Sequence, residues 1–196
     1  LLGFKFGAWE GGHRVPFIAR WPGHIPPGSK STQMICSVDM LATFAAIVDH
    51  PLQKGDGPDS INVLPAFLGD PPQPLRRQVI LTPNRPANLA IREGDWVYIG
   101  AQGSGGFGNG LAELAFTGET NSDITADGRI KPDAPPAQLY RLAADPRQQV
   151  NVIREHPDTA ERLRQQLAAC GAKIPPAKEP APAKKRTKKA NLKERP

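Results

Sequence analysis

A chain of 196 residues, of which 39% are hydrophobic, is long enough to form one ordinary domain with a modest core. No stretch approaches the roughly 20 consecutive apolar residues that a membrane-spanning helix needs, and the first residues lack the charged-then-apolar pattern of a secretory signal. The net charge of +6 comes from the C-terminal end, because residues 172–196 contain nine Lys or Arg and two Glu, and the remaining residues have no basic bias of the kind that nucleic-acid-binding domains carry.

The N-terminal half predicts loops, helices and one strand. Residues 1–20 form a Gly-rich loop, whose glycines suggest a close backbone approach and which ends in a β-prone run at residues 15–18. An amphipathic helix is predicted over about residues 37–49 from apolar residues at helical spacing, namely Leu41, Phe44, Ala45 and Val48. A shorter helix is expected near residues 59–68, and residues 79–81 are typical of a strand.

The C-terminal half predicts a hairpin followed by a helix. Residues 89–92 and 96–99 are β-prone runs separated by a three-residue turn that contains Gly94, and residues 138–142 predict a further strand. A helix is expected to begin at Pro157 and to end at Gly171, with one apolar face formed by Ala160, Leu163 and Leu167.

These elements divide the chain into three expected regions. Residues 1–85 are expected to belong to an α/β domain, and residues 86–171 to form a small α+β subdomain. Residues 172–196 consist mainly of Pro, Ala and Lys, so they cannot bury enough apolar surface to offset the entropy of ordering, and we expect them to be disordered. Because the chain begins with Leu1 and passes at once into motif-like sequence, we expect it to be a fragment of a longer protein.

The most informative motif lies near the N-terminus. Lys5 stands five residues before Glu10-Gly-Gly, which is followed by Arg14-x-Pro16 and then by Trp21-Pro-Gly. This arrangement resembles a segment of the sulfatase (arylsulfatase) family, and several uncommon residues at fixed spacings make the resemblance specific. Further similarity, at residues 37–43, 59–69, 92–98 and 139–151, extends it over roughly residues 1 to 170.

The resemblance implies both a fold and a mechanism. The fold is an alkaline-phosphatase-like α/β domain that carries a small C-terminal antiparallel sheet with a packed helix. The mechanism uses a cysteine or serine oxidised to formylglycine as the nucleophile, together with a divalent cation, usually calcium. The nucleophile motif Cys/Ser-x-Pro-x-Arg and the Asp-Asp or Asp-Asn pair of metal ligands are both missing from the chain. We therefore expect the formylglycine and the metal ligands to lie upstream, outside this chain.

The implied enzyme hydrolyses a sulfate ester, either an aryl sulfate or a sulfated polysaccharide, and is periplasmic or secreted. Lys5 matches the family lysine that contacts the sulfate, so it is the candidate catalytic and substrate-binding residue. The alternative is an ordinary solvated loop lysine. His13 is a second candidate for substrate binding, although a structural histidine bonded to nearby backbone explains it equally well.

Three other charged residues are expected to have structural roles. Glu10 and Arg14 are predicted to pair with each other or to brace the loop, because they stand beside the motif glycines. Asp39 lies near a predicted helix start, where its carboxylate can interact with unpaired amides and with the helix dipole. The cysteines, Cys36 and Cys170, match no metal spacing, and either free thiols or a disulfide would suit them.

Two features suggest other functions. Residues 103–108 match the G-x-G-x-x-G pattern, but the preceding strand belongs to a predicted hairpin, so an insertion loop near the rim of an active site is favoured over a dinucleotide site. The basic tail suggests a non-catalytic module that binds nucleic acid or an anionic polysaccharide through Lys184, Lys185, Arg186, Lys188 and Lys189. Nucleic acid is disfavoured because the tail has no aromatic residue to stack on bases.

Overall fold

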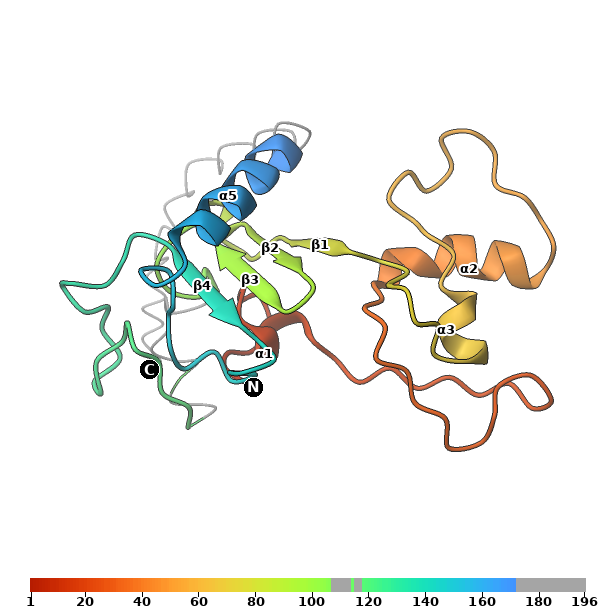
Figure 1. The fold of residues 1–196 in the computed structure, drawn as a ribbon, viewed down its shortest axis with the longest axis horizontal. Helices are drawn as coiled ribbons and strands as arrows, with labels where there is room; N and C mark the ends of the chain where they lie inside the picture. The colour runs from red at the N-terminus through yellow and green to blue at the C-terminus, as the bar shows by residue number, and fades with distance from the viewer. Residues whose placement is uncertain (107–113, 115–117, 172–196) are drawn as a thin grey trace, which may run out of the picture.

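The computed structural model describes residues 1–106, 114 and 118–171. Its centre is a four-stranded antiparallel sheet in which each strand pairs with the next one along the chain (Figure 1). The strands are β1 (Gln78–Leu81), β2 (Ala90–Glu93), β3 (Trp96–Ile99) and β4 (Gln138–Arg141). Helix α5 (Pro157–Gly171) lies against β2 and β3, and the short 3-10 helix η2 (Pro86–Asn88) precedes β2. The strands and the terminal helix predicted for this half are confirmed.

The hairpin between β2 and β3 has a tight turn. Glu93 pairs with Trp96, so only Gly94 and Asp95 connect the two strands. Gly94 has a φ of +56°, which a glycine adopts without steric cost and which suits a two-residue hairpin turn.

Alternate residues of the strands face opposite sides of the sheet, as the pleat requires. On one side, apolar strand residues pack against the apolar face of α5, forming a cluster that includes Ile91, Tyr98, Leu139, Ala160, Leu163 and Leu167. The predicted apolar face of the terminal helix is therefore the face that it buries.

The other side of the sheet is covered by the N-terminus of the chain. Leu2, Ala8 and Trp9 are fully buried there against strand residues that include Val97, Ile99 and Tyr140. The segment continues into a single helical turn, α1 (Glu10–His13), which was not predicted. The first residues thus pack against the C-terminal sheet. The division into an α/β domain ending at residue 85 and a subdomain beginning at residue 86 stays a prediction.

A second part of the structure lies beside the sheet, and residues 14–35 and β1 connect the two parts (Figure 1). It contains η1 (Ser37–Asp39), α2 (Met40–Ile47) and α3 (Leu64–Leu68). The predicted helix over residues 37–49 is confirmed, with a first turn of 3-10 form. The helix expected near residues 59–68 begins only at Leu64, because the amides of Ile61 and Val63 donate to side chains of the preceding segment, Asp39 and Thr43.

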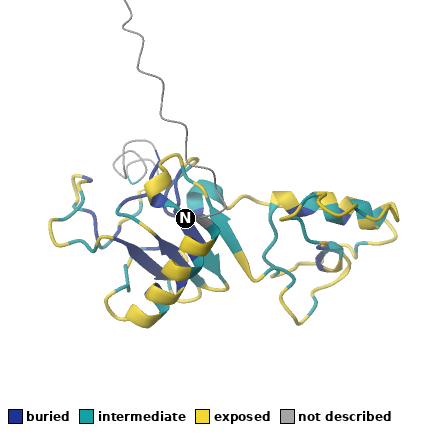
Figure 2. Cartoon of the chain, turned by 90° about the horizontal axis from the view of Figure 1, so that it is seen from above, coloured by how far each residue is buried: buried dark blue, intermediate teal, exposed yellow. Residues whose placement is uncertain are grey.

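The connecting segment, residues 14–35, contains turns at residues 22–24 and 27–28, and most of its residues are exposed to solvent (Figure 2). Its β-prone residues 15–18 form no strand in the part of the chain that the structure describes, because no other strand lies beside them and Pro16 has no N–H to donate. Cys36 and Cys170 are free thiols. The helices among the described residues include none long and apolar enough to cross a membrane. The tail from residue 172, for which we expect disorder, lies outside the described residues.

Candidate functional site

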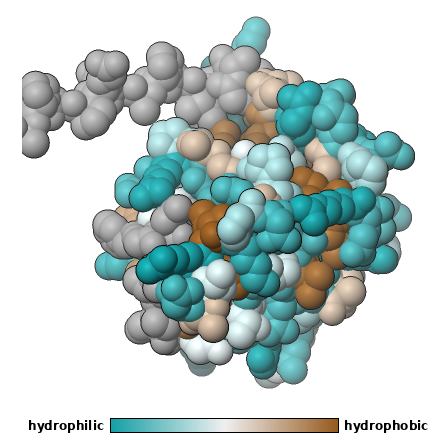
Figure 3. All heavy atoms as spheres, turned by 90° about the vertical axis from the view of Figure 1, so that its left-hand side faces the viewer, coloured by the Kyte–Doolittle hydropathy of each residue, from teal (hydrophilic) through white to brown (hydrophobic). Residues whose placement is uncertain are grey.

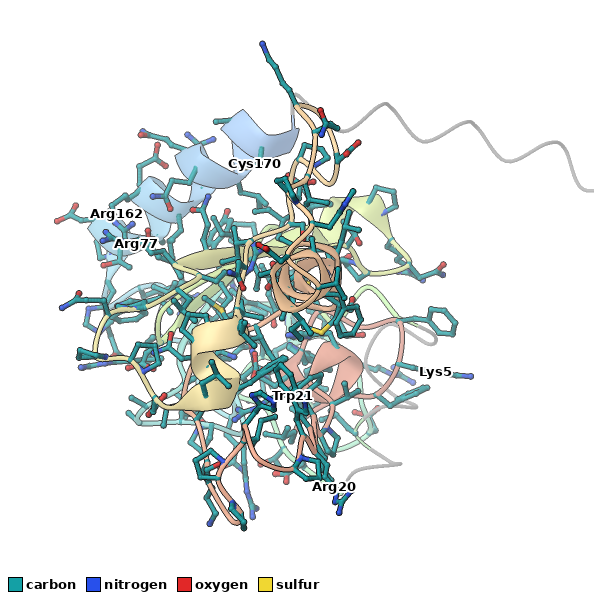
Figure 4. The ribbon with its side chains drawn as sticks, turned by 90° about the vertical axis from the view of Figure 1, so that its right-hand side faces the viewer. Lys5, Arg20, Trp21, Arg77, Arg162 and Cys170 are labelled. Atoms are coloured by element: carbon teal, nitrogen blue, oxygen red, sulfur yellow. The ribbon has the colours of Figure 1, made fainter. Side chains whose placement is uncertain are left out.

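Lys5 is an exposed residue of the loop that precedes α1, and its side chain extends away from the body of the protein (Figure 4). Its Nζ lies 5.4 Å from the centroid of the neighbouring Phe6 ring. No carboxylate among the described residues forms a salt bridge with Lys5. The ammonium group is therefore available to an anion arriving from outside this part of the chain.

The loop that carries Lys5 consists of residues 1–9, which precede α1, and is called the Lys5 loop below. It is anchored to the sheet through Trp9. The indole of Trp9 is fully buried, and its Nε1 donates to Oε1 of Gln138, at a distance of 3.0 Å. The same oxygen accepts the Tyr140 hydroxyl at 2.6 Å. One residue earlier, the Ala8 amide donates to the Ser104 carbonyl at 2.7 Å. Burying a polar group costs free energy unless the group forms a hydrogen bond. Because these hydrogen bonds form only when the loop lies in this position, they determine where the loop packs and also stabilise it there.

The glycines of the motif allow α1 to fold tightly onto the same loop. A Cβ atom on Gly11 would lie 2.2 Å from the carbonyl oxygen of Gly3, and one on Gly12 would lie 2.2 Å from that of Gly7. Neither backbone oxygen can move without shifting the loop. The close backbone approach that the sequence predicted is therefore present, and it holds both ends of the loop around Lys5.

Glu10 is a fully buried carboxylate surrounded by positive charge. Its Oε2 lies 3.4 Å from Nη1 of Arg14 and 3.3 Å from Nη1 of Arg92, a residue of β2. Its amide donates to Oε1 of Gln148 at 2.7 Å. The pairing with Arg14 was predicted from sequence. The contacts with Arg92 and Gln148 were not predicted. Through them, Glu10 fixes α1 to the C-terminal half of the chain.

His13 stands one helical turn after Trp9. Its Nδ1 lies 3.2 Å from the Trp9 carbonyl, and its Nε2 lies 3.4 Å from Oε1 of Glu10. Burial lowers the pKa of His13; Glu10 opposes the effect, and the positive charges of Arg92 and Arg14 strengthen it. These contacts match the structural alternative considered for His13, while its role in substrate binding stays a prediction.

The loop after β3 packs beside the Lys5 loop. The side-chain amides of Gln138 and Asn88 donate to the Gly103 carbonyl at 2.8 and 3.0 Å. Gly105 has a φ of +73°, and its carbonyl accepts the Arg85 amide at 2.9 Å. The strand before this loop is part of an antiparallel hairpin, not of a βαβ unit, so a dinucleotide site finds no support. The rest of the expected insertion loop, residues 107–113, lies outside the described residues.

Asp39 connects three segments of the second part. Its carboxylate accepts the amides of Cys36 at 2.8 Å and Ile61 at 3.2 Å, and it also pairs with the guanidinium of Arg76. Burial alone would raise the pKa of Asp39, but the bonds from Arg76 and from the two amides outweigh it and hold the pKa below its ordinary value. The expected contact with amides at a helix start is present, and Arg76 explains why the charge can be buried.

In the described part of the chain, the main cavity lies apart from the candidate residues, and no metal cluster marks a site. An open cavity of about 850 Å³ lies between the connecting segment and α3, and the described residues that line it do not include Lys5 or His13. Over residues 1–106, 114 and 118–171, no three His, Cys, Asp or Glu side chains gather in a way that could hold a metal ion. The donors present therefore do not fit a divalent cation.

Sequence reasoning missed the residues that reach the site from far along the chain. Arg92 and Gln138 lie in predicted strands, where alternation suggests only that a polar residue faces outward. Gln148 lies in a turn and adopts a φ of +55°. Phe6 was overlooked although it is an aromatic residue among loop glycines beside Lys5, and that is a signal the sequence does contain.

Comparison with curated proteins finds relatives over most of the chain. The chain is 32% identical over 165 residues to an N-acetylgalactosamine-6-O-sulfatase of Bacteroides thetaiotaomicron. The alignment covers 84% of this chain and 29% of the relative. It is 30% identical over 158 residues to human arylsulfatase A, covering 76% of this chain and 28% of the relative. The chain thus spans less than a third of the length of these relatives. No family model matches it.

Solved structures resemble the chain in fold. One, from work on glycosaminoglycan metabolism by Bacteroides thetaiotaomicron, superposes with a TM-score of 0.63 and 28% identity, covering 87% of this chain and 32% of the other. A second, of a protein in complex with D-glucosamine-2-N,6-O-disulfate, has a TM-score of 0.50 and 20% identity, covering 78% and 27%. At 20% identity the second likeness concerns the fold alone.

Proposed function

Because this chain belongs to the sulfatase family, we propose that it forms the C-terminal portion of an enzyme that hydrolyses a sulfate ester to sulfate and an alcohol or phenol. Its fold is that of the family, an alkaline-phosphatase-like α/β architecture whose small antiparallel sheet carries a packed helix. The observation that supports the proposal best is the Lys5 loop. It holds an exposed ammonium group without an ion-pair partner among the described residues, on a backbone anchored at buried Trp9.

Lys5 is proposed to contact the sulfate group during its transfer. The negative charge on the sulfate oxygens and on the leaving oxygen changes as the ester bond breaks, and a positioned ammonium group stabilises that charge. The anchoring of the loop matters because such a donor is effective only when it is already in place. His13, at the end of α1, is proposed to border the same substrate site.

The formylglycine nucleophile and the divalent cation, usually calcium, that the resemblance implies are proposed to be held by residues outside this chain. The described residues gather no metal ligands. The contribution proposed for this chain is to bind and orient the substrate through Lys5. The family also implies a periplasmic or secreted enzyme. The substrate is proposed to be an aryl sulfate or a sulfated polysaccharide, and the likeness to an N-acetylgalactosamine-6-O-sulfatase favours a sulfated sugar.

The test is to replace Lys5 in the complete enzyme and to measure kcat, KM and thermal melting. Lys5→Ala should lower kcat on a sulfate ester by about 100-fold or more, the scale on which loss of one positioned donor is felt. Lys5→Arg should restore only part of the rate, since the planar guanidinium is wider than the ammonium. The melting temperature should stay the same, because an exposed loop lysine makes few contacts on which stability depends.

Lys54→Ala is the matched control, because Lys54 is also an exposed loop lysine but lies outside the Lys5 loop. It should leave kcat unchanged. A normal kcat in Lys5→Ala would overturn the proposed role, and a collapse of its melting temperature would make Lys5 a structural residue.

The alternative function, a binding module that uses the basic tail, rests on the charge of residues 172–196. Truncation after Gly171 separates the two functions. A binding module would lose its salt-sensitive affinity for polyanions, whereas a sulfatase would keep its turnover of a small ester.

A further inference from the structure

Phe6 has an unusual backbone conformation for an aromatic residue. Its φ of +74° lies in the left-handed region, where a side chain with a Cβ is disfavoured by roughly 1–2 kcal/mol and where glycine is the ordinary choice. Backbone bonds hold it there, because the Asn84 amide donates to the Phe6 carbonyl at 3.0 Å and the Gly7 amide donates to the Phe4 carbonyl at 3.2 Å. The loop thus maintains a strained aromatic residue at a place where glycine would fold more easily.

The strain does not serve to bury the ring. The side chain is 47% exposed, so about half of its apolar surface remains in contact with solvent. The ring instead lies next to Lys5, whose Nζ is 5.4 Å from its centroid, within the range of a cation–π contact. Strained residues of this kind gather at functional sites, where the surrounding structure holds them for a purpose other than stability.

We propose that Phe6 is a specificity-determining residue, whose ring stacks against the flat face of the six-membered ring that carries the sulfate ester. This inference rests on the proposed function, since it requires that Lys5 contacts the sulfate. In an aryl sulfate the ester oxygen alone separates the sulfate from the ring, and in a sugar 6-sulfate one methylene group is added. In both, a sulfate bound by Lys5 brings its ring near the neighbouring residue, Phe6. Both pyranose and aryl rings present a flat face with apolar C–H or π character, and an aromatic side chain binds such faces by stacking.

Other residues near Phe6 support a binding role for this surface. The Phe6 carbonyl is bonded to the segment of Asn84 and Arg85, whose own amide bonds to Gly105, so three loops meet at this point. Arg85 is exposed and adds a second positive charge to the surface. Sulfated polysaccharides carry repeated negative charges. A surface that presents the cations of Lys5 and Arg85 beside the exposed ring of Phe6 is complementary to such a ligand.

The test uses the complete enzyme and three variants, Phe6→Gly, Phe6→Tyr and Lys5→Ala. The probes are 4-methylumbelliferyl sulfate, N-acetylgalactosamine 6-sulfate and, as a competitive inhibitor without a ring, inorganic sulfate. For the ester that the parent turns over, Phe6→Gly should raise KM about five- to tenfold with a much smaller change in kcat. Its inhibition constant for inorganic sulfate should stay within twofold of the parent's. Phe6→Tyr, which keeps a stacking ring, should keep KM within about twofold.

Stability separates this role from packing. Glycine adopts a φ of +74° without strain, so Phe6→Gly should melt at or above the temperature of the parent if the ring serves the substrate. An unchanged KM in Phe6→Gly, or a marked fall in its melting temperature, would overturn the inference. Lys5→Ala reports on the proposed function separately: if it keeps the parent kcat, the sulfate contact itself is wrong, whatever Phe6→Gly does.

Discussion

At the scale of single residues, the burial of His13 in α1 makes the stability of the protein depend on pH. Burial lowers its pKa below the ordinary 6.5, so the folded protein binds a proton there less readily than the unfolded chain does. As the pH falls below 6.5, the unfolded state takes up a proton that the folded state still excludes. The contribution of His13 to stability is therefore complete above pH 6.5 and is lost progressively below it.

This argument predicts the behaviour of His13→Gln. Between about pH 7.5 and 5.5, either side of the ordinary histidine pKa, the melting temperature of the parent enzyme should fall further than that of the variant. Thermal melting of both proteins at the two pH values provides the measurement. An equal fall in parent and variant would mean that His13 does not change its proton affinity on folding.

At the scale of elements, the contact between α1 and the Lys5 loop depends on the absence of side chains. Gly12→Ala places a Cβ atom 2.2 Å from the Gly7 carbonyl oxygen and 2.9 Å from that of Phe4. The backbone must move apart, and overpacking of this kind costs about 1–3 kcal/mol. We expect Gly12→Ala to lower the free energy of unfolding by that amount and, because the loop shifts, to reduce kcat as well.

Gly69→Ala is the control for this prediction. No atom lies within 4 Å of the position that a Cβ would take on Gly69, and its φ of −176° is ordinary extended backbone. Its free energy of unfolding should stay within about 0.5 kcal/mol of the parent's. Urea denaturation of the two variants compares them directly, and equal effects would show that the close approach at Gly12 is unimportant.

At the scale of the whole molecule, the two parts of the structure differ in the surface they expose. On the side of the sheet part that faces away from α2 and α3, hydrophilic residues surround small apolar areas (Figure 3). The second part and its connecting segment expose large apolar side chains, among them Phe17, Ile18, Leu41, Phe44 and Val48. Ile18 is 91% exposed and Val48 is 69% exposed. Apolar surface of this extent usually meets another polypeptide.

We therefore expect the 196-residue chain, expressed alone, to self-associate and to be poorly soluble. Phe44→Ser combined with Val48→Ser should reduce that association, because it removes two exposed apolar side chains from α2 and the residue after it. Size-exclusion chromatography and light scattering measure the effect. A monomeric parent chain with a cooperative melting transition would contradict this expectation.

The same chain should have no sulfatase activity. It lacks a nucleophile motif, and the described residues gather no metal ligands. A sulfate ester bound at Lys5 would therefore not be attacked by a nucleophile of this chain. The assay is turnover of an aryl sulfate by the purified chain, with the complete enzyme as the positive control. Any turnover by the chain alone above that of its Lys5→Ala variant would show that the catalytic apparatus is present within these 196 residues.

The sequence by itself determined the features that depend on neighbours along the chain. The helix after Ser37, the hairpin at Gly94 and the apolar face of α5 follow from spacing, turn residues and caps, which act over a few residues. The role predicted for Lys5 also rests on local spacing, because the motif places the lysine, the glycines and the arginine within twelve residues. Where a helix was predicted too long, side chains of Asp39 and Thr43 had bonded the amides that the helix required.

Only the tertiary structure decided how that motif is held. Trp9 bonds to Gln138 across 129 residues, Glu10 bonds to Gln148 across 138, and Arg92 reaches Glu10 across 82. No periodicity marks such partners, because each is chosen by where the sheet places a side chain in space after the chain has closed long loops. The left-handed backbone of Phe6 has the same origin. Its local preference opposes that conformation, and bonds between the Lys5 loop and segments near residues 84 and 104 impose it.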